Sequence, residues 1–154
     1  MSSRRRILFL CTGNCCRSQM AEGLLRQLAG DRYESLSAGA NPAGFVHQLA
    51  IEVLREGGIY ITPQESKHIR DFLPPVGTAP DLIISVCDAA QAECPTFPGT
   101  VDRLHWPLYD PIRATGSTEE RRQAFRKVRD EIRERLEVAI EAGELEGEKR
   151  NSGY

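Results

Sequence analysis

Short apolar runs alternate along this chain with segments of helical periodicity. Runs with the length and composition of β-strands lie at 7–10, 33–37, 81–86 and 104–106. The run at 81–86 is apolar on both faces, which is typical of a central strand in a parallel sheet. Helical spacing predicts helices at 19–29 and 47–56, a helical turn or two opened by Pro63 and Ser66, and a long helix at 117–143. This alternation predicts an open α/β sheet of about four parallel strands with helices on both faces.

The last predicted helix has the clearest ends. Ser117 and Glu120 have the spacing of a capping box, and Gly143 supplies the stop. The residues after Gly143 are mostly charged and lack an apolar stripe. We therefore expect a single catalytic α/β domain at residues 1–143, followed by a charged, disordered C-terminal tail at residues 144–154.

A polar loop joins the first predicted strand to the first predicted helix. The residues from the end of the strand into the helix are Cys11, Thr12, Gly13, Asn14, Cys15, Cys16, Arg17 and Ser18. Backbone N–H groups at a helix N-terminus bind oxyanions, and Arg17 adds a planar fork that can hold two oxygens of a tetrahedral anion. The same positive field favours a thiolate at Cys11, so we predict that its pKa lies well below its ordinary value and that it acts as a nucleophile.

The alternative is that Cys11 is a buried core cysteine and Arg17 a surface residue of the helix. The strand before the loop, the helix after it, Gly13 and Ser18 together favour the catalytic interpretation.

Composition narrows the classes of partner and compartment. The net charge of −2 and the sequence pI of about 6.0 give no reason to expect nucleic acid or a membrane surface as a partner. Five cysteines without a disulfide-scaffold spacing indicate a reducing cytoplasm and thiol chemistry. A zinc site is the competing interpretation, but His47, His68 and His105 are scattered and no Cys-x2-Cys pair exists. We expect no metal and no tightly bound cofactor.

Reactive side chains follow three of the predicted strands. Cys11, Cys87 and Asp110 each lie at or just after a strand, and the carboxyl ends of parallel strands meet at one edge of the sheet. Asp110 precedes Pro111, so it is either an ordinary turn residue or a functional one. Beside a thiolate and a bound oxyanion, negative charge would favour its protonated form, which makes Asp110 a candidate general acid.

The segment at 11–23, CTGNCCRSQMAEG, resembles the nucleophile loop of low-molecular-weight protein tyrosine phosphatases and of the arsenate reductases that share their fold. Thr12, Gln19 and Glu22 look more like the reductase branch. The resemblance covers nearly the whole chain, from Ile7 to Leu136. Phosphatases of this fold tend to place aromatic residues after the Asp-Pro pair, whereas Ile112 and Arg113 stand there in this chain. A pocket without that aromatic wall suits a small inorganic oxyanion.

The segment between Cys87 and Cys94, followed by a Pro-x-x-Pro motif and by His105-Trp106, resembles the redox segment of thioredoxin-coupled arsenate reductases. The two cysteines are seven positions apart, about 10 Å along a helix, whereas a disulfide needs Cα atoms within about 7 Å. Residues 88–93 are alanine-rich and favour a helix when the thiols are reduced. We therefore predict that oxidation unwinds this segment; the alternative is a loop in both states.

The resemblance implies an arsenate reductase that converts arsenate to arsenite. In this scheme Cys11 attacks arsenic, with Asp110 as the acid, and the disulfide then passes from Cys11–Cys87 to Cys87–Cys94. Thioredoxin or a similar dithiol donor would reset the pair. The resemblance further implies a cytoplasmic monomer with weak phosphatase side activity. Two alternatives stay open: a low-molecular-weight tyrosine phosphatase that does not use Cys94, and a catalytically silent oxyanion-binding module.

Two positions depart from the family pattern. Cys15 stands where relatives usually carry serine, and we expect no role for its thiol. Lys67 stands where some reductases have an aspartate that helps to hold potassium, together with residues matching Asn14, Glu22 and Ser37. We expect the Lys67 ammonium to replace the ion and potassium dependence to be weak; the alternative is a solvated surface lysine.

Overall fold

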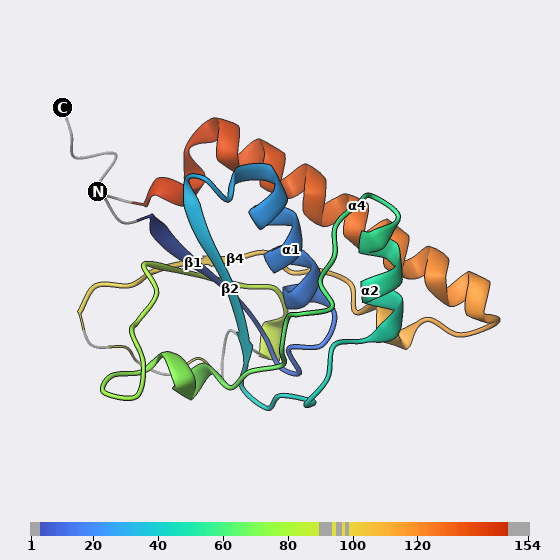
Figure 1. Ribbon diagram of the computed structural model, residues 1–154, viewed down its shortest axis with the longest axis horizontal. Coiled ribbons are helices and arrows are strands. Elements are labelled where there is room, and N and C mark those ends of the chain that lie inside the picture. The colour runs from blue at the N-terminus through green and yellow to red at the C-terminus, as the bar shows by residue number, and fades with distance from the viewer. Residues whose placement is uncertain (1–3, 90–93, 95–96, 98, 148–154) are drawn as a thin grey trace.

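The computed structural model describes residues 4–89, 94, 97 and 99–147, and its centre is a parallel β-sheet (Figure 1). The four strands are β1 (Arg5–Cys11), β2 (Tyr33–Gly39), β3 (Leu82–Ser85) and β4 (Asp102–His105). They are all parallel and lie in the order β2-β1-β3-β4. The predicted open α/β sheet of four parallel strands is confirmed.

Strand β1 occupies the middle of the sheet and pairs with β2 on one side and β3 on the other. Leu8, for example, faces Leu36 of β2 and Ile83 of β3. The chain therefore moves outward in one direction to β2 and later returns to the other side of β1. In such a sheet, the crevice beyond the carboxyl ends of β1 and β3 is the switch point where ligands bind.

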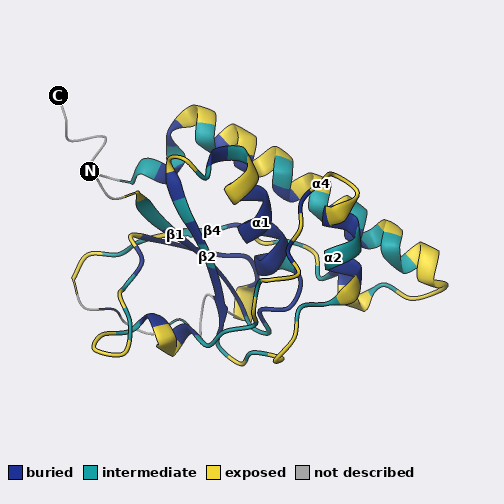
Figure 2. Cartoon of the chain, viewed as in Figure 1, coloured by how far each residue is buried: buried dark blue, intermediate teal, exposed yellow. Residues whose placement is uncertain are grey.

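Three helices, α1 (Arg17–Ala29), α2 (Gln48–Arg55) and α4 (Thr118–Ala142), contact one another and cover the core (Figure 1). The apolar stripe of α4 is buried, as the dark segments of that helix in Figure 2 show. The predicted capping box is present: the Glu120 N–H donates to Ser117 Oγ at 3.1 Å, and the Ser117 N–H donates to Glu120 Oε1 at 3.0 Å. Gly143 ends the helix with a left-handed φ of 73°, a conformation that glycine adopts without strain. No helix in the described ranges is both long and apolar enough to span a lipid bilayer.

The helical turn expected to follow Pro63 and Ser66 is the 3-10 helix η1 (Ile69–Phe72), which begins three positions after Ser66. Local capping sets its start, because the ring nitrogen Nδ1 of His68 accepts a hydrogen bond from the Arg70 N–H at 3.0 Å. Ile69 and Phe72 are buried and anchor η1 to the core.

The chain after Gly143 also differs from the predicted tail. A further 3-10 helix, η3 (Glu144–Glu146), follows α4 directly, and Leu145 within it is fully buried. The Arg5 guanidinium donates to the Leu145 carbonyl at 2.6 Å, and the Tyr33 hydroxyl donates to Glu146. Residues 144–147 therefore belong to the packed domain, whereas the rest of the predicted tail, 148–154, lies outside the described residues.

Ion pairs join α2 to α4 on the surface. Glu56 accepts hydrogen bonds from Arg126 and Arg129 of α4, and Arg122 pairs with Glu52. The hydrogen bond from Arg126, with help from Arg129, lowers the pKa of Glu56 to about 2. These contacts fix α2 against α4 and so hold the segment that leads into α2 close to the end of β1.

Candidate active site

The predicted nucleophile, Cys11, is the last residue of β1, and its thiol lies within a ring of polar contacts. Its Sγ atom is 2.9 Å from Ser18 Oγ and accepts a hydrogen bond from the Asn14 N–H at 3.2 Å. The Asn14 side-chain amide donates to Ser18 Oγ at 2.9 Å, which leaves the Ser18 hydroxyl proton free to point at sulfur. Asn14 has a φ of 48°, the left-handed conformation that asparagine tolerates better than most residues. This turn aims its N–H back at the thiol.

Burial raises the pKa of the Cys11 thiol, and this shift is only partly opposed by the hydrogen bonds from Ser18 and Asn14 and by the Arg17 charge. The prediction of a pKa well below the ordinary value is therefore wrong for this geometry. The pKa is raised because Cys11 lies inside the sheet, where it is 3% exposed and the thiolate loses hydration. The donors that stabilise a thiolate are nevertheless in place.

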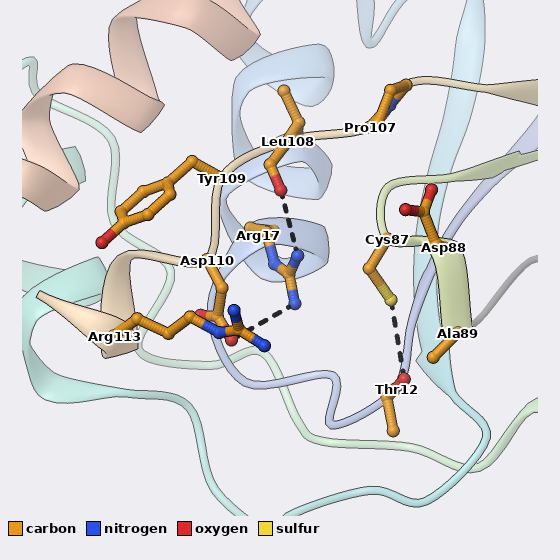
Figure 3. A pocket seen from close by; sticks show the side chains of 10 residues that line it. All are labelled: Thr12, Arg17, Cys87, Asp88, Ala89, Pro107, Leu108, Tyr109, Asp110 and Arg113. Carbon is orange, nitrogen blue, oxygen red and sulfur yellow. Dashed lines mark hydrogen bonds and ion pairs between the residues drawn. The ribbon is translucent and has the colours of Figure 1, made fainter.

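Arg17 and Asp110 come together although 93 residues separate them along the chain. The Arg17 guanidinium donates to the Leu108 carbonyl at 3.1 Å and lies 3.6 Å from Asp110 Oδ2 (Figure 3). Asp110 Oδ1 also accepts the Ile112 N–H at 3.1 Å, which caps the 3-10 helix η2 (Pro111–Arg113). Asp110 is thus a turn residue and a neighbour of the loop arginine at once.

Cys87 lies two residues beyond β3 and directs its thiol toward the same loop. Its Sγ atom is 3.5 Å from Thr12 Oγ1 (Figure 3). Both residues line a cavity of about 450 Å³ at the carboxyl end of the sheet, and Arg17 and Asp110 form part of its wall. The sequence prediction that Cys11, Cys87 and Asp110 share one edge of the sheet agrees with this arrangement.

The cavity does have an aromatic wall, because Tyr109 lines it and is 55% exposed. The prediction of a pocket without an aromatic wall is therefore wrong, because the aromatic residue precedes the Asp-Pro pair instead of following it. Asp88 and Arg113 also line the cavity and were not identified as site residues. For Tyr109 and Arg113 the signal was available, since both lie within three positions of Asp110.

Cys94 lies apart from this cavity. The Arg103 guanidinium of β4 donates to Cys94 Sγ at 2.8 Å, and both residues line a smaller cavity of about 130 Å³ together with Ser85 and His105. All five cysteines are described and carry free thiols. Residues 90–93 lie outside the described part of the chain, so the predicted helix at 88–93 stays a prediction beyond Asp88 and Ala89, which are helical.

A chain of hydrogen bonds ties the start of the Cys87–Cys94 segment to β4. The His105 ring bonds Asp88 Oδ1 through Nε2 at 2.8 Å and Ser85 Oγ through Nδ1 at 2.7 Å. No pattern in the sequence pairs His105 with Asp88 or Ser85, so this contact was not predicted. It fixes the residue that follows Cys87, and with it the direction of that thiol.

Lys67 is more than a solvated lysine. Its ammonium lies 3.8 Å from Glu22 Oε1, the same oxygen that accepts the Ser37 hydroxyl at 2.6 Å. The Lys67 backbone N–H donates to Asn14 Oδ1 at 2.7 Å, which supports the turn beneath Cys11. The ammonium also donates to the Glu65 carbonyl at 2.8 Å, so it lies between that carbonyl and the Glu22 carboxylate. The expectation that it takes the place of a potassium ion stays a prediction.

Comparison with known proteins gives the chain its family. The model of the low molecular weight phosphotyrosine protein phosphatase family matches residues 6–150. An arsenate reductase of Bacillus licheniformis is 43% identical over 142 residues, which cover 92% of this chain and 99% of the relative.

Two solved structures share the fold. A thioredoxin-dependent arsenate reductase of Corynebacterium glutamicum superposes with a TM-score of 0.65 at 28% identity, over 92% of this chain and 64% of that one. A low molecular weight protein tyrosine phosphatase of T. tengcongensis gives a TM-score of 0.72 at 25% identity, over 90% of this chain and 99% of that one. The chain belongs to the low molecular weight phosphotyrosine protein phosphatase family, and within it to the branch of the arsenate reductases.

Proposed function

We propose that this protein reduces arsenate to arsenite with its own thiols as the source of electrons. The observation that carries the proposal is the second thiol, Cys87, in contact with the nucleophile loop at Thr12 and in the same cavity as Arg17 and Asp110. Hydrolysis of a phosphate ester needs one thiol in such a site, whereas reduction of an oxyanion needs at least two. The 43% identity to an arsenate reductase supports the same reaction.

In the first step, arsenate binds to the N–H groups of the loop 12–17 and to the Arg17 guanidinium. Arg17 currently binds the Leu108 carbonyl and faces Asp110, so the anion must compete for this cation. Cys11 attacks arsenic as a thiolate, and Asp110 gives a proton to the departing oxygen, which leaves as water. The negative charge of the bound oxyanion favours the protonated Asp110 that this step needs.

In the second step, the Cys87 thiolate attacks Cys11 Sγ, and the pair of electrons in the sulfur–arsenic bond goes to arsenic. Arsenite leaves and a Cys11–Cys87 disulfide remains. The electrons balance, because As(V) takes up two electrons on becoming As(III) and two thiols give up two on forming one disulfide.

In the third step, Cys94 attacks Cys87, which frees Cys11 and moves the disulfide to Cys87–Cys94. Cys94 must leave its contact with Arg103 to do so, since it lines a different cavity from Cys87. We assign the external reductant to the thioredoxin class, by analogy with the thioredoxin-dependent relative, and the reaction to a reducing cytoplasm. The substrate is a small oxyanion, and the chain acts as a monomer.

The test compares the wild-type protein with the Cys94→Ser variant in two assays. Wild type should form arsenite over many turnovers with thioredoxin, thioredoxin reductase and NADPH, whereas Cys94→Ser should stop after one turnover as Cys11–Cys87. Hydrolysis of an aryl phosphate, which needs no disulfide, should be the same in both proteins. Undiminished steady-state arsenite formation by Cys94→Ser would contradict the role of Cys94, and its absence in wild type would contradict the proposed function.

Phosphomonoester hydrolysis is the second candidate, and two observations favour it. Tyr109 offers an aromatic wall, and a cavity of about 450 Å³ exceeds the needs of an inorganic anion. The aryl phosphate arm of the same test measures this activity. A high rate there, with no arsenite formed, would make the protein a phosphatase.

A further inference from the structure

Two adjacent thiols on the nucleophile loop have no part in the proposed reaction. Cys15 and Cys16 direct their sulfur atoms toward each other, and the two Sγ atoms are 3.7 Å apart. Cys15 is 8% exposed and Cys16 is 2% exposed. This is a buried vicinal dithiol, and Cys15 is the less buried of its two members.

The two thiols share a hydrogen bond and therefore titrate as a pair. The hydrogen bond with Cys16 lowers the pKa of Cys15, and the same hydrogen bond, with burial, raises the pKa of Cys16. The first proton comes off the pair readily and the second is held, because two neighbouring thiolates repel each other. Cys15, the less buried member of the pair, is thus the better nucleophile toward a thiophilic centre.

We propose that the Cys15–Cys16 dithiol is a binding site for trivalent arsenic. Soft thiolates select soft, thiophilic ions. Trivalent arsenic is pyramidal with bond angles of roughly 100°, so two sulfurs bound to it at about 2.3 Å lie about 3.5 Å apart. The observed separation of 3.7 Å is close to that spacing, so the pair can close on one arsenic after a small movement of sulfur. The site differs from the Cys11–Cys87–Cys94 series, which exchanges electrons.

The binding step changes no oxidation state. Arsenite, As(OH)₃, loses two hydroxyl groups, the two thiols lose two protons, and two molecules of water leave as two sulfur–arsenic bonds form. Cys15, the less buried thiol, forms the first bond. The second bond, to Cys16, is then intramolecular, and such a linked second contact strengthens binding by about 100- to 10,000-fold over a single one.

Occupation of this site would inhibit the enzyme. The Cys15 carbonyl accepts the His47 N–H at 2.9 Å, and Arg17 and Asp110 are close enough to act electrostatically on the Cys15 thiol. Arsenic bridging Cys15 and Cys16 lies in the loop that has to bind the oxyanion. The inference rests on the proposed function only for the source of the ligand, because arsenite is the product released beside this dithiol.

The experiment measures arsenite binding without turnover. The full chain carrying Cys87→Ser and Cys94→Ser removes the competing thiols, and equilibrium dialysis against arsenite counts bound arsenic. We expect about one arsenic per chain and a loss of affinity of at least about 100-fold when Cys15→Ser is added. Cys16→Ala should have the same effect, and Cys11→Ser in the same background should leave binding intact.

Unchanged affinity on adding Cys15→Ser would overturn the proposal, as would loss of binding with Cys11→Ser. Cys15→Ser decides the matter even if Cys16→Ala fails to fold, because Cys15 is the less buried of the two and serine is nearly its size. A second readout uses aryl phosphate hydrolysis in the Cys87→Ser, Cys94→Ser protein, each variant measured relative to its own uninhibited rate. Arsenite should inhibit that protein, a dithiol should reverse the inhibition, and added Cys15→Ser should resist it. Binding found in a protein that does not reduce arsenate would refute the proposed function and leave this site standing.

Discussion

The hydroxyl of Ser18 offers the sharpest test of how the loop makes Cys11 reactive. Ser18 is fully buried, and its Oγ lies 2.9 Å from Cys11 Sγ while it accepts the Asn14 amide. Its proton therefore points at sulfur, where it stabilises the thiolate. Ser18→Ala removes this donor and leaves burial, which raises the pKa of Cys11, less opposed. We expect the variant to need a higher pH for the same reactivity.

The size of the effect follows from the kind of contact. A hydrogen bond to a charged group contributes about 1.5–3 kcal/mol, which corresponds to roughly 10- to 100-fold in the population of thiolate at neutral pH. Because burial raises the pKa of Cys11, the thiolate is the minor form at neutral pH and its population rises with pH. The rate of a reaction that uses the thiolate should therefore rise with pH in both proteins, and the profile of Ser18→Ala should lie to the alkaline side.

The assay is the rate of alkylation of Cys11 by iodoacetamide as a function of pH, with the modified residue located by fragmentation mass spectrometry. Ser37→Ala is the matched control, because Ser37 is also a buried serine but donates to Glu22 rather than to the thiol. Its profile should coincide with that of wild type. If Ser18→Ala also coincides with wild type, Ser18 does not stabilise the thiolate and the argument fails.

Three further predictions concern the nucleophile, the cation beside the loop and the ion pairs between α2 and α4. Cys11→Ser should abolish both arsenite formation and aryl phosphate hydrolysis, and activity retained in either assay would remove the nucleophile assignment. Lys67→Met removes the ammonium from beside the buried Glu22 carboxylate, which keeps its contact with Arg26. We expect the unfolding free energy to fall by about 1–3 kcal/mol and potassium chloride to restore part of the loss. An equal midpoint in urea for both proteins would show that the ammonium contributes nothing. Glu56 has a folded pKa of about 2, below its ordinary value, so its contribution is present at neutral pH and lost as pH falls from about 4 toward 2. Glu56→Gln should cost up to about 1 kcal/mol at pH 6, since the pair is exposed, and progressively less as the pH of the urea titration falls toward 2.

Local signals predicted the fold well where each element's pattern is complete within its own sequence. Three local signals agree with the observed ends of α4 and β3 to within about two residues. They are the capping box of Ser117 and Glu120, the stop at Gly143 and the apolar run at 81–86. The tail was wrong at 144–147 because its burial comes from distant partners. Leu145 carries no local signal that distinguishes it from a solvated residue, and its neighbours in the chain are charged.

The same difference between local signals and distant contacts decides which features of the site could be predicted. The nucleophile loop is contiguous, so residues 11–18 could be identified from spacing alone, and the topology of a parallel sheet was enough to bring Cys87 and Asp110 to it. The pKa of Cys11 could not be predicted, because burial and hydrogen bonding oppose each other and their balance depends on depth within the sheet. The contact of the Lys67 ammonium with Glu22 has no local signal in the sequence, because Lys67 is held by a hydrogen bond to Asn14, 53 positions away.

The contacts of the Cys87–Cys94 segment with β4 were the hardest feature to predict from sequence. They also bear on the motion that we expect of this segment. Asp88 binds His105 and Cys94 binds Arg103, so the residues near both ends of the Cys87–Cys94 segment contact side chains of the same strand, β4. These contacts assemble only when β3 and β4 are paired, and no pattern within the segment records them. A Cys87–Cys94 disulfide requires Cα atoms within about 7 Å, and it uses the sulfur to which Arg103 donates. Because Asp88 holds the Cys87 end through a separate hydrogen bond, we expect the Cys94 end to be the one that leaves β4 as the disulfide forms.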